Sequence, residues 1–295
     1  MKVLLTGASG FIGSQLTRRL ESAGHRVLTV GRRAGAGYDW SEESLARGVR
    51  EADTVIHLAG ENLFAKRWSA RQKEILRSSR MDGTAKLAAL VAASKPACFI
   101  SASAVGYYGP SETARFHEGS PQGQDFLADI CGEWEASTDA AAKAGVRTAI
   151  VRTGVVLGLG GGALSKMLPP FRLGLGGPLG NGRQWVSWVH IDDLVSLFLF
   201  LLENPQASGA FNGTAPQPVS MKEFAKALGR ALHRPAIFPV PAPILRLALG
   251  EVADILLTGQ HVEARRVRES GFQFQFKDID SALTDIVGKK AGGKS

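Results

Sequence analysis

Short apolar runs alternate with longer amphipathic stretches over the first two thirds of the chain. Val3 to Thr6 is a continuous run typical of a strand buried on both faces. After it, Ile12, Leu16 and Leu20 recur four residues apart, as on one face of a helix, and Gly24 is suited to end that helix. Further strands are expected at 26–30, 54–58, 98–101 and 147–152, and further helices at 69–94, 125–144 and 192–202. The alternation predicts an α/β fold, a Rossmann doubly wound parallel sheet with helices on both faces.

The density of glycine changes after the last of these strands. Glycine-rich segments, which predict loops, follow at 158–162, 174–178 and 180–182. From Pro235 onward, four prolines fall within nine residues and indicate a separate segment. We predict a Rossmann domain over 1–215, with 156–190 contributing loops to a cleft, and a smaller C-terminal α/β lobe over 235–290.

Composition narrows the possible functions. The formal net charge of +8 would suit a nucleic-acid partner, but the basic residues are scattered and no nucleic-acid module is recognisable. No apolar run approaches the roughly 18 residues that span a membrane. The chain runs directly into a strand without the pattern of a signal peptide, which predicts a cytoplasmic protein. Two cysteines, Cys98 and Cys131, lie far apart, so neither a disulfide scaffold nor a metal site is expected. The expected partner is a small-molecule substrate, and a homodimer is compatible with the sequence.

The strongest chemical signal is a glycine triplet between the first strand and the first helix. Gly7 permits a tight turn, Gly10 lets the backbone approach a pyrophosphate, and Gly13 lets helix and strand pack closely. The start of a helix offers free N–H groups and the positive end of its dipole to phosphate. The spacing predicts a dinucleotide site. Its expected residues are Thr6, Gly7, Ser9, Gly10, Phe11, Ile12 and Gly13.

The end of the second strand indicates which cofactor is preferred. A site for NAD would place Asp or Glu there to accept a hydrogen bond from the ribose. This chain has Arg32 and Arg33, which cannot accept hydrogen bonds but can hold a 2′-phosphate. The sequence favours NADP(H), with two solvated arginines as the alternative interpretation.

Several segments together resemble a known family, the extended short-chain dehydrogenase/reductases. They are the glycine loop, His57-Leu58-Ala59-Gly60 and Ser101-Ala102-Ser103. Motifs at 58–62, 154–158, 170–178, 188–194 and Gly259-Gln260 are similar to an atypical branch. That branch is described as epimerase family proteins, sometimes labelled cell division inhibitor (SulA-like), with a C-terminal lobe of unknown function. The resemblance covers nearly the whole chain and implies that Leu58, Ala59, Gly60 and Glu61 also bind the cofactor.

The resemblance also implies where catalytic residues should lie. In the wider family a Tyr-x-x-x-Lys pair moves the proton and a serine orients the substrate oxygen. Ser103 aligns with that serine, but Leu127 and Cys131 align with the tyrosine and the lysine, and neither can replace them. Tyr107 and Tyr108 are candidates for the missing tyrosine, with packing as their alternative role. We expect Ser103 and Tyr107 to meet the segments 174–178 and 182–188 over the carboxyl ends of the strands.

Two histidines are interpreted as structural. His57 lies within a strand and is expected to be a hydrogen-bonded core residue, and His190 is expected to fix loop geometry with Asp192 or Asp193. Two functions follow from the whole sequence. The first is an NADP(H)-dependent oxidoreductase or epimerase-like enzyme. The second is an NADP(H)-binding protein without catalysis that reports redox state to a partner.

Overall fold

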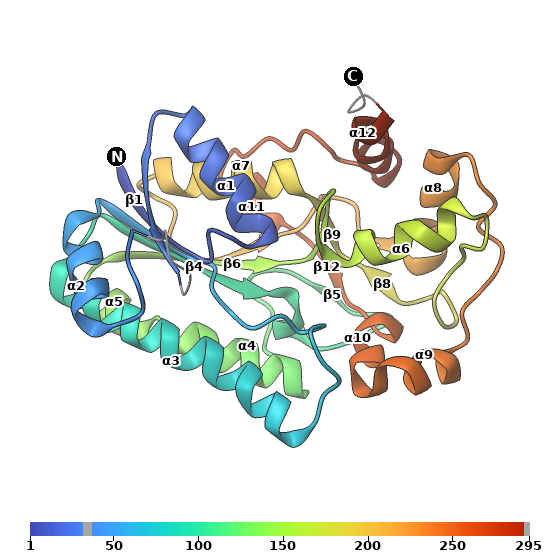
Figure 1. Ribbon diagram of the computed structural model, residues 1–295, viewed down its shortest axis with the longest axis horizontal. Coiled ribbons are helices and arrows are strands. Elements are labelled where there is room, and N and C mark those ends of the chain that lie inside the picture. The colour runs from blue at the N-terminus through green and yellow to red at the C-terminus, as the bar shows by residue number, and fades with distance from the viewer. Residues whose placement is uncertain (32–36, 292–295) are drawn as a thin grey trace.

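A six-stranded sheet forms the centre of the molecule in the computed structural model, which describes residues 1–31 and 37–291. The strand order is β10-β6-β4-β3-β1-β2, and every neighbouring pair is parallel (Figure 1). The strands are β1 (Lys2–Thr6), β2 (Arg26–Val30), β3 (Thr54–His57), β4 (Cys98–Ala104), β6 (Arg147–Thr153) and β10 (Gly209–Gly213). The Rossmann-type parallel sheet predicted from the sequence is confirmed.

Helices cover both faces of this sheet (Figure 1). One face carries α1 (Phe11–Ser22), α7 (Ile191–Glu203) and α11 (Arg265–Glu269). The other carries α2 (Glu42–Glu51), α3 (Ala70–Ser94), α4 (Phe126–Ala136) and α5 (Asp139–Lys143). Successive residues of a strand point to opposite faces, so Val3 and Leu5 of β1 join the core under α1 and α7, while Leu4 joins the core under α2 and α3. This is why the run from Val3 to Leu5 is apolar without alternation.

The order of the strands reverses at β1, which lies between β2 and β3. Ligands of open α/β sheets bind outside the carboxyl ends of the strands at such a reversal. The loops after β1 and β3 touch there, because a Cβ at Gly7 would lie 2.9 Å from the carbonyl carbon of Leu58. The fold therefore brings two of the predicted cofactor segments together.

A second group of elements packs beside the carboxyl ends of the strands (Figure 1). Its short strands pair as β7 (Val155–Leu157) with β9 (Trp188–His190), β8 (Trp185–Val186) with β11 (Val219–Ser220), and β5 (Arg115–Phe116) with β12 (His261–Val262). Its helices are η1 (Val105–Tyr108), α6 (Gly162–Arg172), α8 (Met221–Leu232), α9 (Ala242–Leu249), η2 (Gly250–Val252), α10 (Ala253–Leu257) and α12 (Ile279–Ala291). A core of its own includes Leu164, Trp188, Phe224 and Leu283.

The expectation of loops over 156–190 is only partly correct. The segment contains α6, on which Leu164, Leu168 and Phe171 recur at helical spacing and are buried. The flanking glycines and the pair Pro169-Pro170 concealed this helical periodicity in the sequence.

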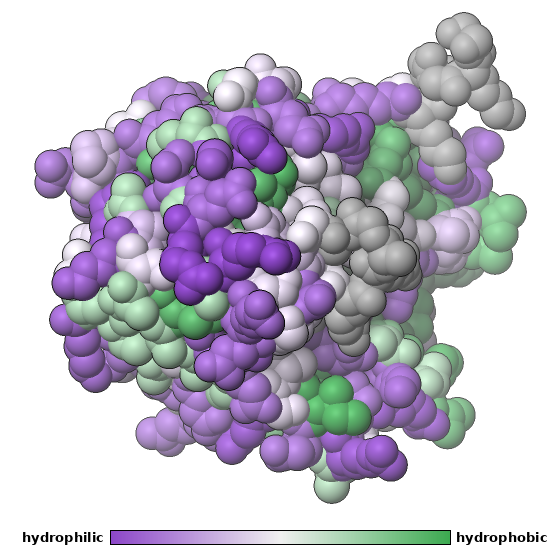
Figure 2. All heavy atoms as spheres, turned by 60° about the vertical axis from the view of Figure 1, so that its left-hand side comes forward, coloured by the Kyte–Doolittle hydropathy of each residue, from purple (hydrophilic) through white to green (hydrophobic). Residues whose placement is uncertain are grey.

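The surface at the β2 and α2 end of the sheet is mostly hydrophilic, with small apolar areas between the polar side chains (Figure 2). Scattered apolar groups of this kind are normal on a protein surface. Among the helices of the described residues, none combines the length and the apolar character needed to cross a bilayer.

Candidate functional site

The turn between β1 and α1 is closed by its own backbone. The N–H of Gly10 donates to the carbonyl oxygen of Gly7 over 3.0 Å, and Gly7 adopts a positive φ of 72°. Gly13 packs so closely on the turn that a Cβ there would lie 2.1 Å from the oxygen of Gly7. No side chain among the described residues caps α1, so the N–H groups at its start can bind an anion. Gly7, Gly10 and Gly13 therefore shape one turn whose position before α1 would suit a phosphate.

The turn forms one wall of a cavity of about 510 Å³. The predicted cofactor residues that line this cavity are Gly7, Gly10, Phe11, Ile12, Gly13 and Leu58. Others lie next to it, since Ser9 is exposed on the turn and Gly60 and Glu61 pack against Arg80. Arg32 and Arg33 lie outside the described residues. The structure thus brings most of the predicted cofactor segments to one cavity.

Thr6 has a supporting role beneath the turn. Its hydroxyl oxygen accepts hydrogen bonds from the N–H groups of Leu58 and Ala59 over 3.2 Å. Because these use both lone pairs, its own proton is left to donate to Nδ1 of His57 over 2.7 Å. The other ring nitrogen of His57 then donates to Thr84 over 2.9 Å. Burial lowers the pKa of His57 to about 4, so the ring stays neutral. The prediction that His57 is a hydrogen-bonded core residue is confirmed, and Thr6 ties the loops after β1 and β3 together.

Ser103 lies at the end of β4 and lines the same cavity. Its hydroxyl donates to Oε1 of Glu135 on α4 over 2.7 Å. Arg152 at the end of β6 holds this carboxylate with two hydrogen bonds of 2.8 Å, and the two side chains are only 5% and 11% exposed. Burial opposes the charge of Arg152, but the hydrogen bonds and charge of Glu135 outweigh it and raise the pKa of the guanidinium. The result is a serine whose proton points at a fixed, charged carboxylate.

The two candidate tyrosines lie on the other side of this network. The hydroxyl of Tyr108 is buried, donates to Oδ1 of Asn212 over 2.7 Å and accepts from Arg152 over 3.0 Å. Burial raises the pKa of Tyr108 to about 12. The ring of Tyr107 lies flat against Arg152, whose guanidinium carbon is 3.4 Å from the ring centroid. Neither tyrosine lines the cavity that contains Ser103. The structure does not bring them to the serine, and their catalytic role stays a prediction.

Tyr107 lines a different hollow of about 780 Å³, whose lining comes mainly from α4, α5 and β6. Glu135 also reaches this hollow, as does Arg147 at the start of β6. The carboxylate of Glu135 therefore connects two spaces, because it binds Ser103 of the main cavity and lines the second hollow.

Of the two segments expected to lie over the strand ends with Ser103, 174–178 and 182–188, only the second lines the cavity. The cavity is lined by Gln184, Trp185 and Val186 from the segment 182–188. The segment 174–178 instead packs away from it, since a Cβ at Gly176 would strike Phe171 and one at Gly177 would strike the backbone of Phe238. The glycines of this segment therefore serve close packing between α6 and the chain before α9.

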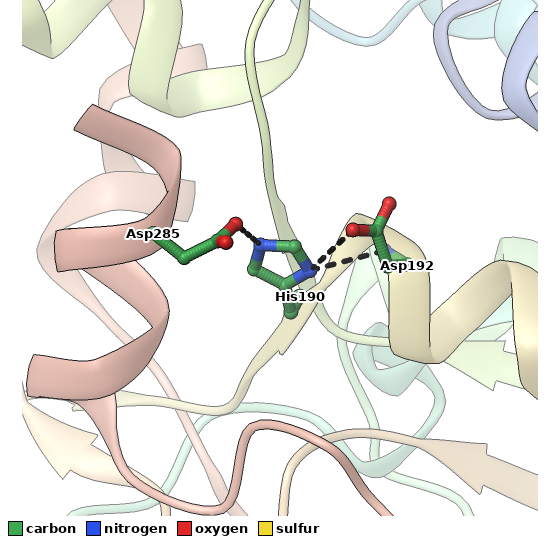
Figure 3. Close-up of side chains that lie close together, drawn as sticks. All are labelled: His190, Asp192 and Asp285. Carbon is green, nitrogen blue, oxygen red and sulfur yellow. Dashed lines mark hydrogen bonds and ion pairs between the residues drawn. The ribbon is translucent and has the colours of Figure 1, made fainter. Parts of the chain in front are cut away.

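A separate cluster holds α12 onto the rest of the molecule. Figure 3 shows the ring of His190 between the carboxylates of Asp192 and Asp285. Nδ1 of His190 accepts the N–H of Asp192 at the start of α7, so the proton is on Nε2, which faces Asp285 over 3.2 Å. The prediction that His190 fixes geometry with Asp192 is confirmed. The ammonium of Lys289 lies 2.9 Å from Asp192 and 2.8 Å from Asp285, and fills the place that a metal ion would take between these acids.

Sequence reasoning missed Glu135 and Arg152. One signal was available for Glu135, which follows Leu127 and Cys131 at four-residue intervals and so shares their face of α4. No local pattern marks Arg152, because its partners come from α4, from η1 and from the loop that contains Glu118.

A doubly wound sheet with a glycine turn at the reversal and a serine at the end of β4 defines a Rossmann-type protein of the short-chain dehydrogenase/reductase class. The chain belongs to the NAD dependent epimerase/dehydratase family, which it matches over residues 3–212. Residues 240–286 match a second family, a domain of unknown function (DUF1731).

Individual relatives match along nearly the whole chain. The mouse "epimerase family protein SDR39U1" is 45% identical, covering 97% of this chain and 100% of the mouse protein. The homologue from Arabidopsis thaliana, described as chloroplastic, is 44% identical over 97% of this chain and 87% of its own length. The crystal structure of human epimerase family protein SDR39U1 (isoform2) with NADPH is 38% identical, with a TM-score of 0.91, covering 98% of this chain and 99% of the human chain. Since one relative is chloroplastic, the cytoplasmic location expected for this chain stays a prediction.

Proposed function

We propose that this chain is an NADP(H)-dependent oxidoreductase that acts on a small molecule held between the glycine turn and Ser103. The observation that carries the proposal is the 2.7 Å hydrogen bond from Ser103 to Glu135, at a cavity that the glycine turn also lines. When bound, the cofactor supplies or accepts the hydride, and the protein supplies orientation and proton transfer.

Ser103 and Glu135 can carry the proton that the substrate loses. In the oxidising direction, the substrate hydroxyl donates to Oγ of Ser103 while the proton of Ser103 passes to Oε1 of Glu135. The alcohol becomes a carbonyl when its carbon loses a hydride, for which the bound cofactor would be the acceptor. Glu135 also lines the second hollow, beside α4, α5 and β6, which offers a route for the proton to water. Reduction runs the same steps in reverse, with one proton taken up.

Several observations support NADP(H) as the cofactor. The human relative at 38% identity was crystallised with NADPH. The turn of Gly7, Gly10 and Gly13 leads into α1, whose first N–H groups have no side-chain cap among the described residues and can bind a pyrophosphate. In the sequence, Arg32 and Arg33 follow β2, where a 2′-phosphate would be bound.

We expect tighter binding of NADPH than of NADH, and a selective loss in Arg32→Glu. A charged hydrogen bond contributes roughly 1.5–3 kcal/mol, so this variant should bind NADPH about 10- to 150-fold more weakly. Its affinity for NADH should change little. Isothermal titration calorimetry with both cofactors measures the effect. Equal affinity of the unmodified protein for the two cofactors would contradict the assignment.

Ser103→Ala should lower turnover by about 10²-fold, the low end of what a positioned acid–base group contributes. The substitution removes the link between substrate oxygen and Glu135 but leaves the glycine turn intact, so the Kd for NADPH should not change. The assay follows NADPH consumption with a panel of aldehydes and ketones. Ser101→Ala is the matched control, because Ser101 lies two residues earlier on β4 and does not line the cavity. Equal loss in both variants would refute a specific role for Ser103.

A second candidate function is NADP(H) binding without catalysis. It is favoured by Leu127 and Cys131, which we assign to the positions of the usual tyrosine and lysine. Both face Gly106 of η1, where an added Cβ would lie 3.4 Å from Leu127 and 3.6 Å from Cys131. Burial raises the pKa of Cys131 to about 12, so its thiol does not exchange protons near neutral pH. Tight NADPH binding together with no turnover over the whole panel would select this function.

A further inference from the structure

The exposed apolar side chains of this protein gather around helix α9, at the end of the molecule away from β2 and α2 (Figure 1). Among the described residues outside this region, only Met1 and Ile75 are large, apolar and exposed. A concentrated apolar area of this kind marks an interaction surface, whereas scattered apolar groups do not. We call it the α9 surface, and its side chains are Leu173, Leu175, Ile237, Phe238, Ile244 and Leu247.

The α9 surface comes from three segments that lie side by side. The segment after α6 is bonded to the chain before α9, since the N–H of Phe238 donates to the carbonyl oxygen of Gly176 over 3.1 Å. Helix α9 begins shortly after this contact and buries none of its residues. Ile244 and Leu247 lie three residues apart and so share one face of the helix. The six side chains therefore belong to one region of the surface.

The chain that carries this surface is basic. The stretches 161–190 and 224–250 contain all six apolar residues and include no Asp or Glu. Arg230 pairs with Asp280 and Arg246 pairs with Asp254, while the other lysines and arginines of these stretches form no ion pair among the described residues. These unpaired cations are Lys166, Arg172, Arg183, Lys226 and Arg234.

Some of the cations adjoin the apolar side chains directly. Lys226, Arg230 and Arg234 line a hollow of about 620 Å³ together with Ile237. Arg234 is also bonded to the chain next to Leu173, because its Nε donates to the carbonyl oxygen of Arg172 over 3.1 Å. A partner that fits this surface must therefore combine apolar groups with negative charge.

Two observations indicate which partner has this chemistry. A second copy of the chain, related by a two-fold axis, would bring the unpaired cations of one copy against those of the other. Leu173 is 75% exposed and Leu247 is 80% exposed, so these side chains stand out from the surface. A bilayer accepts protruding side chains without a complementary shape, whereas a protein partner must provide a pocket for each.

We propose that the α9 surface binds peripherally to phospholipid bilayers that contain anionic lipids. The protruding apolar side chains enter the interfacial region of the bilayer. The unpaired cations around them meet the negative headgroups. The inference does not depend on the reaction that the cavity performs.

Vesicle flotation with the full chain tests the proposal. Vesicles of equal parts phosphatidylglycerol and phosphatidylcholine should carry the protein up a density gradient, and vesicles of phosphatidylcholine alone should not. Leu173→Gln combined with Leu247→Gln should weaken this binding about 10²-fold, because two leucines no longer enter the bilayer. Lys226→Gln combined with Arg234→Gln should weaken it about 30-fold, since each cation near an anionic surface contributes about 5-fold. All four side chains are exposed, and thermal unfolding checks that the variants remain folded.

Matched variants elsewhere separate this surface from general attraction by the formal net charge of +8. Ile75→Gln on α3 removes an exposed apolar side chain, and Arg18→Gln combined with Arg19→Gln removes two exposed cations from α1. Both should bind the anionic vesicles as the unmodified protein does. Equal losses in the two charge variants, or no binding to anionic vesicles, would overturn the proposal. Self-association that Leu173→Gln with Leu247→Gln abolishes would also overturn it, because a second copy would then cover this surface.

Discussion

Gly13→Ala is expected to weaken NADPH binding by about 10²- to 10⁴-fold, equivalent to two charged hydrogen bonds of roughly 1.5–3 kcal/mol each. The added Cβ would lie 2.1 Å from the carbonyl oxygen of Gly7 and 2.9 Å from the Cα of Ala8. These are backbone atoms of the turn itself and cannot rotate away. The turn must therefore separate from α1, which moves the N–H groups that face the phosphates. Calorimetric titration with NADPH, alongside thermal unfolding, measures the two consequences separately.

Gly288→Ala is the matched control. Gly288 lies in α12, where an added Cβ meets no atom within 4 Å, and alanine favours a helix over glycine by roughly 1 kcal/mol. It should leave NADPH binding unchanged and raise the unfolding temperature slightly. If Gly13→Ala bound NADPH as well as the control, the phosphate could not lie on this turn.

Arg152→Met should lower the free energy of unfolding by about 3–5 kcal/mol, the cost of breaking a buried ion pair from one side. The substitution removes two hydrogen bonds of 2.8 Å to Glu135 and the bond to Tyr108. Glu135 would remain charged in a place where its side chain is only 11% exposed. Denaturant unfolding followed by circular dichroism measures the loss.

Two further variants distinguish the contribution of the ion pair to stability from the effect of its burial. Adding Glu135→Gln to Arg152→Met should recover much of the loss, because no uncompensated charge remains. Arg230→Met removes a pair of similar geometry with Asp280, in which the side chains are 59% and 53% exposed, and should cost no more than about 1 kcal/mol. A similar loss of unfolding free energy in Arg152→Met and Arg230→Met would show that burial does not increase the contribution of the Arg152–Glu135 pair to stability.

Local patterns in the sequence were enough to predict the sheet and the phosphate-binding turn. The apolar run from Val3 to Thr6 and the glycine spacing after it involve only residues that are close in sequence. Both can therefore be recognised without the three-dimensional structure. Helix α6 was missed because Gly161, Gly162 and Pro169-Pro170 concealed the period of its buried residues.

The network behind Ser103 could not be predicted in the same way. Glu135 and Arg152 meet across α4 and β6, and nothing near either residue indicates the partner. Ser103 was identified by resemblance to a family, whereas the carboxylate that accepts its proton required the three-dimensional structure.

The attachment of α12 sets an order for folding during synthesis. Asp193 near the start of α7 accepts hydrogen bonds from the N–H groups of Gln275 and Phe276, and His190 faces Asp285. Elements made early therefore stay incomplete until residues more than 80 positions later have left the ribosome. Domains generally fold as units while the chain emerges. For this protein the sheet can assemble first, but the second core, which includes Leu283 and Ile286, closes only after α12 is made. We expect a nascent chain stalled before α12 to expose the apolar surface of the second core, to which chaperones can bind.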